Sequence, residues 1–341
     1  MAMYKALSTK YSRFAAAAIL YAGFAGYLYQ PYFKQFHGLQ YLLIVNICLG
    51  SLGCFVLSRR WVASFFGSFF AGAVYGFGPF SLGLACYHPA AGLLTASIPW
   101  LFLPAAFGPK ARWRWLRFPL CALPFLMIVL FSQMVTYLRL FVIPVGLKLG
   151  LADLAGLLVP LVMAERNMTL VGFYHVPVAP LIIGFSMLLV ARRFAVLAIL
   201  AIGIVLAFCS SFFQVSPIIW LAFPVLCSSV IIGEGMQGLV LADPADRKWV
   251  LVTAMIMGTL SAVTLLQASR HFEIFAGLGT EYAKLLVEAA TMYILGTIAV
   301  AIVYFTARAK LRIHWLRLVI LCLAMAVDIF LGARFIVDKI F

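Results

Sequence analysis

Apolar stretches of about 20 residues recur along the whole chain, and they constrain the fold more than any other feature. A helix needs about 20 apolar residues to cross the roughly 30 Å of hydrocarbon in a bilayer. The chain has 341 residues, of which 65% are hydrophobic and 10% are charged, whereas soluble proteins carry about 25% charged residues. A membrane β-barrel would need alternating segments of about ten residues, and none are found in the sequence. The sequence therefore predicts an all-α, polytopic integral membrane helical bundle.

We predict about eleven transmembrane helices, and we interpret the N-terminal apolar run as a retained first span, not a cleaved signal peptide. The apolar segment 149–163 is too short to cross, contains Asp153 and ends at Pro160, so we expect an external amphipathic or re-entrant helix there. The spans are predicted at 13–31, 39–58, 62–85, 89–108, 117–138, 173–191, 193–213, 216–241, 249–269, 286–307 and 316–336.

Lysine and arginine residues are divided unevenly between the two sides that these spans define. The N-terminal segment and five internal loops carry 17 of the 25 on one side. Because cytoplasmic loops are rich in basic residues, we place the N-terminus in the cytoplasm and the C-terminus outside, in what we expect to be a bacterial inner membrane. The net charge of +15 has the same origin. No segment resembles a nucleic-acid-binding module, so nucleic acid is not an expected partner.

Three short segments recur in the same order and at equivalent places relative to the spans. The pairs are RFAAAAIL (13–20) with RFAVLAIL (193–200), SRRWV (58–62) with DRKWV (246–250), and KARWRWLR (110–117) with KLRIHWLR (310–317). Basic loops with interfacial tryptophan are common in membrane proteins, which is one explanation. The other is a tandem, parallel duplication, a known transporter design.

The duplication predicts an organisation of five spans, one connecting span and five spans. The first repeat would cover 1–138 and the second 192–341, with an external segment and the sixth span at 139–191. The loop GLVLADPADRKWVL (238–251) resembles the basic loop of major facilitator transporters, in which glycine and aspartate precede basic residues. The first copy, GSLGCFVLSRRWVA (50–63), lacks the aspartate. The resemblance covers fourteen residues and does not imply membership of that family.

Polar residues inside the predicted spans are candidates for a central site, because ionisable groups in a membrane are costly and usually functional. Glu234 lies between two glycines, with Gln237 shortly after it, and Asp328 lies near the middle of the last span. The repeat offset of 188 residues pairs Glu234 with Asn46. We predict a midplane substrate or ion site made of these four residues, in which a carboxylate binds a proton or cation. The alternatives are interhelical hydrogen bonds and, for Asp328, an ion pair with Arg334.

A second candidate site faces outside and contains His88, His175, Glu165, Arg166 and His271. Histidine binds metals and haem, but the sequence has no HxxxH, HExxH or CxxCH spacing. We therefore predict no metal site and leave the cofactor unknown, with haem or a metal as alternatives. A tyrosine precedes each of His88 and His175, which is typical of interfacial anchoring.

Three functions are compatible with these features. The leading hypothesis is a multi-pass transporter or permease-like protein with a midplane polar site between two repeated halves. The alternatives are a non-transporting subunit of a larger membrane complex, with lipid, quinone or haem contacts at the outer face, and an enzyme acting on a lipid-linked substrate. Expected partners are membrane lipid and other membrane subunits or a second copy. The seven cysteines form no CxxC motif, and we expect them to act as small hydrophobic residues.

Overall fold

The computed structural model describes residues 2–85, 87–108, 115–138, 143–165, 172–270, 280–309 and 313–341. Regular structure in these ranges is helical, without strands. Short 3₁₀ helices are η1 (Gln30–Gln35), η2 (Gly38–Gln40), η4 (Ala152–Leu157) and η5 (Pro217–Leu221). The α-helices are α1 (Ala2–Tyr29), α2 (Tyr41–Ser58), α3 (Phe65–Gly76), α4 (Pro79–Ala85), α5 (Pro89–Phe107), α6 (Arg117–Tyr137), α7 (Pro160–Glu165), α8 (Val178–Val190), α9 (Phe194–Phe208), α10 (Ala222–Leu241), α11 (Arg247–Arg270), α13 (Thr280–Arg308) and α14 (His314–Ile340).

Eight helical segments in the described ranges are long and apolar enough to cross a membrane, and each matches a predicted span. They are Gly38–Ser58, Phe65–Ala85, Pro89–Phe107, Phe118–Tyr137, Pro217–Leu241, Arg247–Arg270, Tyr282–Arg308 and His314–Ile340. The prediction of a helical membrane bundle is thereby confirmed. The other three predicted spans correspond to α1, α8 and α9. Helices α8 and α9 have only 13 and 15 residues, and basic residues such as Arg13 lower the hydropathy of α1.

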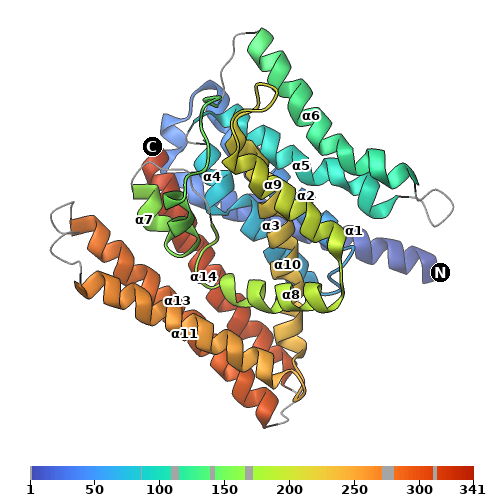
Figure 1. Ribbon diagram of the computed structural model, residues 1–341. Coiled ribbons are helices and arrows are strands. Elements are labelled where there is room, and N and C mark those ends of the chain that lie inside the picture. The colour runs from blue at the N-terminus through green and yellow to red at the C-terminus, as the bar shows by residue number, and fades with distance from the viewer. Residues whose placement is uncertain are drawn as a thin grey trace.

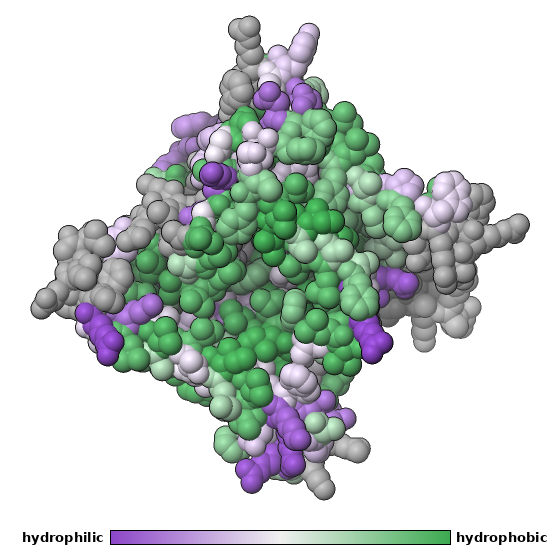
Figure 2. Space-filling model, in the orientation of Figure 1, coloured by the Kyte–Doolittle hydropathy of each residue, from purple (hydrophilic) through white to green (hydrophobic). Residues whose placement is uncertain are grey.

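The helices form a bundle around α2, α3 and α10. Helix α2 packs against α5, α3 and α1, and α10 packs against α8 and α3. Helices α11 and α13 lie side by side and pack mainly against each other, and Figure 1 shows this pair in orange at one edge of the bundle. Hydrophobic residues fill the middle of the face seen in Figure 2, and hydrophilic residues gather at its margins, as expected for a molecule embedded in a bilayer.

The two predicted repeats do not pack in the same way. The duplication pairs α2 with α10 and α5 with α13. Helices α2 and α5 are close partners, whereas α10 lies mainly against α8 and α3, and α13 lies mainly against α11. The tandem duplication therefore stays a prediction from the sequence.

Glycine allows the central helices to approach closely on both sides of Glu234. A Cβ atom on Gly233 would lie 2.6 Å from the carbonyl oxygen of Gly67 in α3. A Cβ atom on Gly235 would collide with the carbonyl of Pro180 in α8. The two glycines therefore serve contacts with two different helices, which explains the Gly-Glu-Gly pattern by packing.

The segment 149–163 contains two short helical elements, and the expectation that it does not cross the membrane stays a prediction from the sequence. It holds η4 and the start of α7, each element being six residues long. Asp153, which interrupts the apolar run, accepts a hydrogen bond from the amide of Gly150 at 2.8 Å. Its carboxylate thus stabilises the turn that precedes η4.

The second basic octapeptide attaches α14 to the C-terminal end of α10. Arg317 is 2% exposed, and its guanidinium donates to the carbonyl of Ala242 at 2.7 Å and to the Thr306 hydroxyl at 2.8 Å. A cation next to a helix C-terminus interacts favourably with the helix dipole. At the end of α2, partial burial and the positive charge of Arg13 lower the pKa of Arg59. Arg13 and Arg59 therefore share one side of the bundle.

Candidate functional site

Helix α8 is a half-length helix that begins near the middle of its neighbours. Its 13 residues extend about 20 Å, which is less than the roughly 30 Å of hydrocarbon in a bilayer. The residues just before it contact Asp328, which lies close to the midpoint of the 27-residue α14. The chain thus turns beside the middle of α14 before α8 begins.

The span formed by α3 and α4 is interrupted beside this turn. Helix α3 ends at Gly76 and α4 begins at Pro79, where the missing amide hydrogen of proline cannot continue a helical ladder. The interruption frees the carbonyl of Phe77, which accepts a hydrogen bond from the Tyr174 hydroxyl at 2.7 Å. The carbonyl of Tyr75 accepts another from the Ser81 hydroxyl at 2.6 Å. The break between α3 and α4 and the turn before α8 therefore meet near the middle of α14.

A buried histidine–aspartate pair joins α14 to the turn before α8. His175 Nδ1 lies 3.0 Å from Asp328 Oδ1, and the two side chains are 1% and 2% exposed. The other carboxylate oxygen, Oδ2, accepts a hydrogen bond from the amide of Val176 at 2.6 Å. Both oxygens of Asp328 are therefore used, and the carboxylate supplies an acceptor that the backbone at the start of α8 needs.

This geometry defines the roles of the two imidazole nitrogens. When Asp328 is ionised, its carboxylate can only accept hydrogen bonds, so Nδ1 of His175 is then the donor in this contact. Nε2 is then the nitrogen with a free lone pair, and it is buried without a hydrogen-bond partner among the described residues. One imidazole nitrogen thus contacts a carboxylate, and the other has a free lone pair. Histidines that bind a proton, a polar ligand or a metal have this arrangement.

Tyrosines hold the pair in place. The Tyr293 ring lies edge-on to His175, with ring centroids 5.0 Å apart and an interplanar angle of 84°, and its hydroxyl donates to the carbonyl of Leu158 at 2.7 Å. Tyr174 packs against Gly332, where a Cβ atom would collide with the tyrosine ring. The glycine one turn after Asp328 therefore lets the Tyr174–His175 segment lie directly on α14.

The four residues of the predicted midplane site have different partners. Asn46 donates to the carbonyl of Pro89 at 2.7 Å. The Gln237 side-chain oxygen accepts from the amides of Ala63 and Ser64, at 2.8 and 3.0 Å. These contacts tie α2 to the start of α5 and α10 to the start of α3, which favours structural roles for both amides.

Glu234 and Asp328 also belong to separate places. Glu234 Oε1 lies 3.3 Å from Arg193 Nη1, and the two side chains are 17% and 37% exposed. Asp328 pairs with His175, whereas Arg334, its expected ionic partner, lies 3.8 Å from Asp338. The structure therefore brings together one residue from the predicted midplane site and one from the predicted outer site, His175.

The other outer residues do not join His175 in the described part of the chain. His88 is the N-cap of α5, and its Nδ1 accepts a hydrogen bond from the amide of Ala90 at 3.1 Å. Glu165 is the last residue of α7, but its side chain lies outside the described residues, as do Arg166 and His271. Zinc sites use three or four protein ligands. The described residues include no cluster of three histidine, cysteine or acidic side chains.

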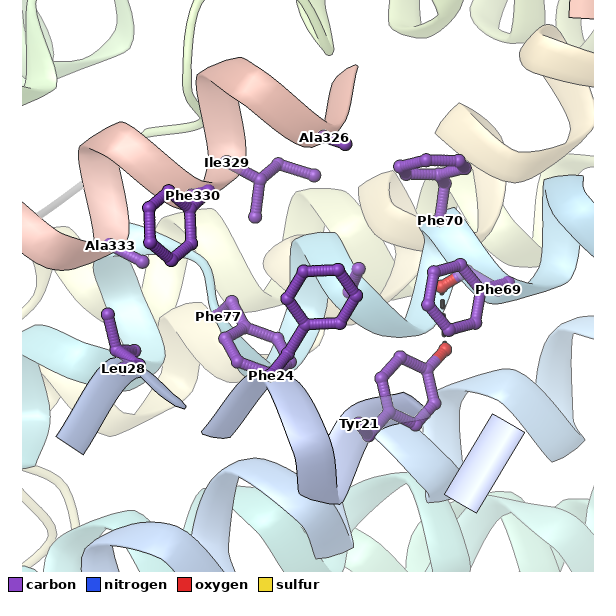
Figure 3. A pocket seen from close by; sticks show the side chains of 11 residues that line it. Tyr21, Phe24, Leu28, Phe69, Phe70, Phe77, Ala326, Ile329, Phe330 and Ala333 are labelled. Atoms are coloured by element: carbon purple, nitrogen blue, oxygen red, sulfur yellow. Dashed lines mark hydrogen bonds between the residues drawn. The ribbon is translucent and has the colours of Figure 1, made fainter. Parts of the chain in front are cut away.

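Two cavities flank these pairs. A small one of about 50 Å³ lies between α1, α3 and α14, on the side of α14 away from His175. Figure 3 shows its apolar lining, including Phe24, Phe77 and Ile329, with Tyr21 donating to the carbonyl of Phe69 at 2.6 Å. A larger one of about 210 Å³ lies beside the Arg193–Glu234 pair. The apolar lining of the smaller cavity offers water almost no hydrogen-bond partner on that side of α14.

Sequence reasoning missed the positioning roles of Tyr174 and Tyr293 at this site, and it missed Arg193 as the partner of Glu234. The Tyr-His dipeptide at 174–175 was visible, but nothing in it identified Asp328 as the partner 153 residues away. The apolar stretch that forms α8 is short and lies between a proline and a pair of arginines. This feature of the sequence could have predicted a half-length helix.

Comparisons with protein-family models, with curated proteins and with solved structures found no match for this chain.

Proposed function

We propose that the protein is a transporter or permease-like membrane protein, with its substrate or ion site at the junction of α8, α3–α4 and α14. The observation that carries the proposal is the buried His175–Asp328 pair at two helix interruptions. Transporters commonly bind their cargo at mid-membrane, where helices are discontinuous and free backbone groups are available. Burying a carboxylate there is costly unless it has partners, so a role in binding explains why Asp328 is present.

The chemistry of the pair supports proton or cation binding during a transport cycle. The lone pair on His175 Nε2 can accept a proton, and Asp328 stabilises the resulting imidazolium. Protonation would place a charge beside the start of α8 and change the strength of its contact with α14. The proposal therefore concentrates the predicted midplane site on Asp328 and adds His175, with Asn46, Gln237 and Glu234 outside it.

The proposal includes the eleven-span topology, with the N-terminus inside and two repeated halves. Cysteine accessibility tests the topology in a background without native cysteines. Gly150→Cys should react with a membrane-impermeant maleimide added outside, and Val190→Cys should react only after the inside is opened. Both positions are exposed. Labelling of both from the same side would refute this arrangement around α8.

A flux screen tests the function. Proteoliposomes with native protein, with Asp328→Asn protein and without protein would be given pooled amino acids, organic anions, sugars and inorganic cations. Mass spectrometry, with elemental analysis for the cations, would measure the solutes taken up. We expect at least one solute to accumulate with native protein and not with Asp328→Asn. The screen would be run with the pH gradient imposed in each direction. If no such solute accumulated under either gradient, the result would count against the proposal.

A second candidate, a non-transporting subunit that holds haem, is favoured by the free Nε2 of His175. Histidine is a common axial ligand of haem iron. The visible absorption spectrum of purified protein distinguishes the two functions. A Soret band that disappears in His175→Ala and persists in His88→Ala would support the haem-binding subunit over the transporter.

A further inference from the structure

The largest of the described cavities lies between α5, α6, α8, α9 and α10, and its lining is almost entirely apolar. Its volume is about 210 Å³. Phe102, Ile199 and Leu226 form part of the wall, together with the thiols of Cys121 and Cys227. Such a space suits a hydrocarbon chain, because burying apolar surface against apolar walls is favourable and needs no polar partner.

One end of the cavity is charged. Arg193 and Glu234 line it there, joined by their 3.3 Å ion pair, and Trp61 lies beside them. Arg193 remains 37% exposed, and an arginine side chain has five N–H donors, so the Glu234 contact leaves donors facing outward. Arg192, the preceding residue in the chain, is exposed and has no acidic partner among the described residues. Two arginines and one glutamate leave this end with an excess positive charge.

The depth of the cavity confines it to one leaflet. Along α9 the lining runs from Arg193, the N-cap of the helix, to Ile199, which corresponds to about 9 Å of helix. That is less than half of the roughly 30 Å hydrocarbon thickness. Arg193 and Trp61 lie just beyond the ends of α9 and α2, so the charged end lies at a headgroup level and the apolar end extends toward the bilayer centre. Tryptophan is enriched at the headgroup level, which agrees with Trp61 at this end.

We propose that this cavity binds one acyl chain of an anionic phospholipid from the leaflet next to Arg192 and Arg193, with the lipid phosphate on the guanidinium of Arg193. The apolar wall takes the chain, and the planar guanidinium donates two parallel hydrogen bonds to phosphate oxygens. Glu234 holds Arg193 at the cavity mouth and neutralises only one of the two arginines. The remaining positive charge selects anionic over zwitterionic headgroups.

Native mass spectrometry of the full-length protein tests this lipid site. The protein would be released from nanodiscs containing equal amounts of phosphatidylglycerol and phosphatidylcholine. We expect one phosphatidylglycerol molecule to be retained in preference to phosphatidylcholine. Arg193→Gln should lower that preference about tenfold, as expected for the loss of a charge-assisted hydrogen bond. Arg192→Gln removes the same excess charge but not the phosphate contact, so it should lower the preference less than Arg193→Gln does. Lys248→Gln, at an exposed residue that does not line the cavity, is the matched control and should leave the preference unchanged.

A cavity-filling variant tests the position of the acyl chain. Ala195 lines the cavity and is exposed, so Ala195→Phe places a ring in the space with little disturbance of the packed helices. It should reduce retention of both lipids while the unfolding temperature stays near that of the native protein. Undiminished phosphatidylglycerol retention in folded Arg193→Gln, or undiminished retention of both lipids in folded Ala195→Phe, would overturn the assignment. The lipid assay does not depend on any transport activity.

Discussion

The two acid–base pairs of this protein, His175–Asp328 and Arg193–Glu234, lie in opposite environments. The first is at most 2% exposed and sits where two helices are interrupted. The second is 37% and 17% exposed and lies at the mouth of an apolar cavity. Both acids are rare charges inside predicted spans, and the sequence alone assigned them to one site. The difference teaches that burial and partner, more than depth in a span, distinguish the two pairs.

The largest expected effect comes from breaking the buried pair. His175→Ala leaves the Asp328 carboxylate buried with a single amide donor, and removing one partner of a buried pair costs about 3–5 kcal/mol. Unfolding by SDS titration from mixed micelles should show this loss in the free energy of unfolding. His88→Ala is the control, because losing an N-cap costs about 0.5–2 kcal/mol. Equal losses in the two variants would remove the distinction between a buried pair and a cap.

A double-mutant cycle separates the pair from its surroundings. Asp328→Asn should destabilise the protein, and adding His175→Ala should cost much less than His175→Ala costs alone. Coupled neighbours typically show interaction energies of about 0.5–3 kcal/mol. Strictly additive losses in the same SDS titration would show that the 3.0 Å contact contributes little.

Close packing beside the buried pair should show the next largest effect. Gly332→Ala forces a methyl group into the Tyr174 ring, and overpacking typically costs about 1–3 kcal/mol. Gly258→Ala in α11 is the control, because its nearest contact would be at 3.9 Å. We expect a lower unfolding temperature for the first variant and an unchanged or slightly higher one for the second. A stable Gly332→Ala protein would mean that Tyr174 does not need to lie on α14.

The interfacial pair should contribute little to stability. Exposed ion pairs are worth about 0–1 kcal/mol, so Glu234→Gln and Arg193→Gln should unfold nearly like the native protein in the same titration. A loss as large as that of His175→Ala would show that Arg193 and Glu234 are also part of the folded core, and the contrast between the two pairs would fail.

The smallest effect is expected at the end of α14, where Tyr32 donates a hydrogen bond to Asp338 at 2.7 Å. This bond to the carboxylate raises the pKa of Tyr32 above its usual 10.0. The contact therefore stabilises the folded state fully below that usual value, and its contribution is lost as the pH rises through the raised pKa. The difference between the ultraviolet titrations of native and Tyr32→Phe protein isolates this residue. Asp338→Asn should move the midpoint down, and an unmoved midpoint would contradict the bond.

Much of the architecture could be predicted from the sequence because length and hydropathy are local properties. Eight predicted spans match long apolar helices, and the segment 149–163, which we expect outside the membrane, contains two short helical elements. The halves of a broken span were harder to predict. Residues 62–85 read as one span, although Pro79 marks the interruption between α3 and α4.

The site was predicted only in part because a sequence gives the depth of a residue but not the direction it faces. Asp328 and His175 were both singled out, but in separate sites, since nothing local connects residues 153 positions apart. The glycines beside Glu234 suggested a ligand or a helix nearby. They face two helices, α3 and α8. A glycine that allows close helix packing and a glycine that borders a binding site look the same in a sequence.

The most direct test of the central claim is the flux of a solute identified by the screen, measured in matched proteoliposomes of native, Asp328→Asn and Glu234→Gln protein. All three would be checked first for native helix content and equal reconstitution. We predict that Asp328→Asn lowers the rate to that of protein-free vesicles, while Glu234→Gln retains most of the native rate. A native rate in Asp328→Asn, or a loss confined to Glu234→Gln, would contradict a transport site at the junction of α8, α3–α4 and α14.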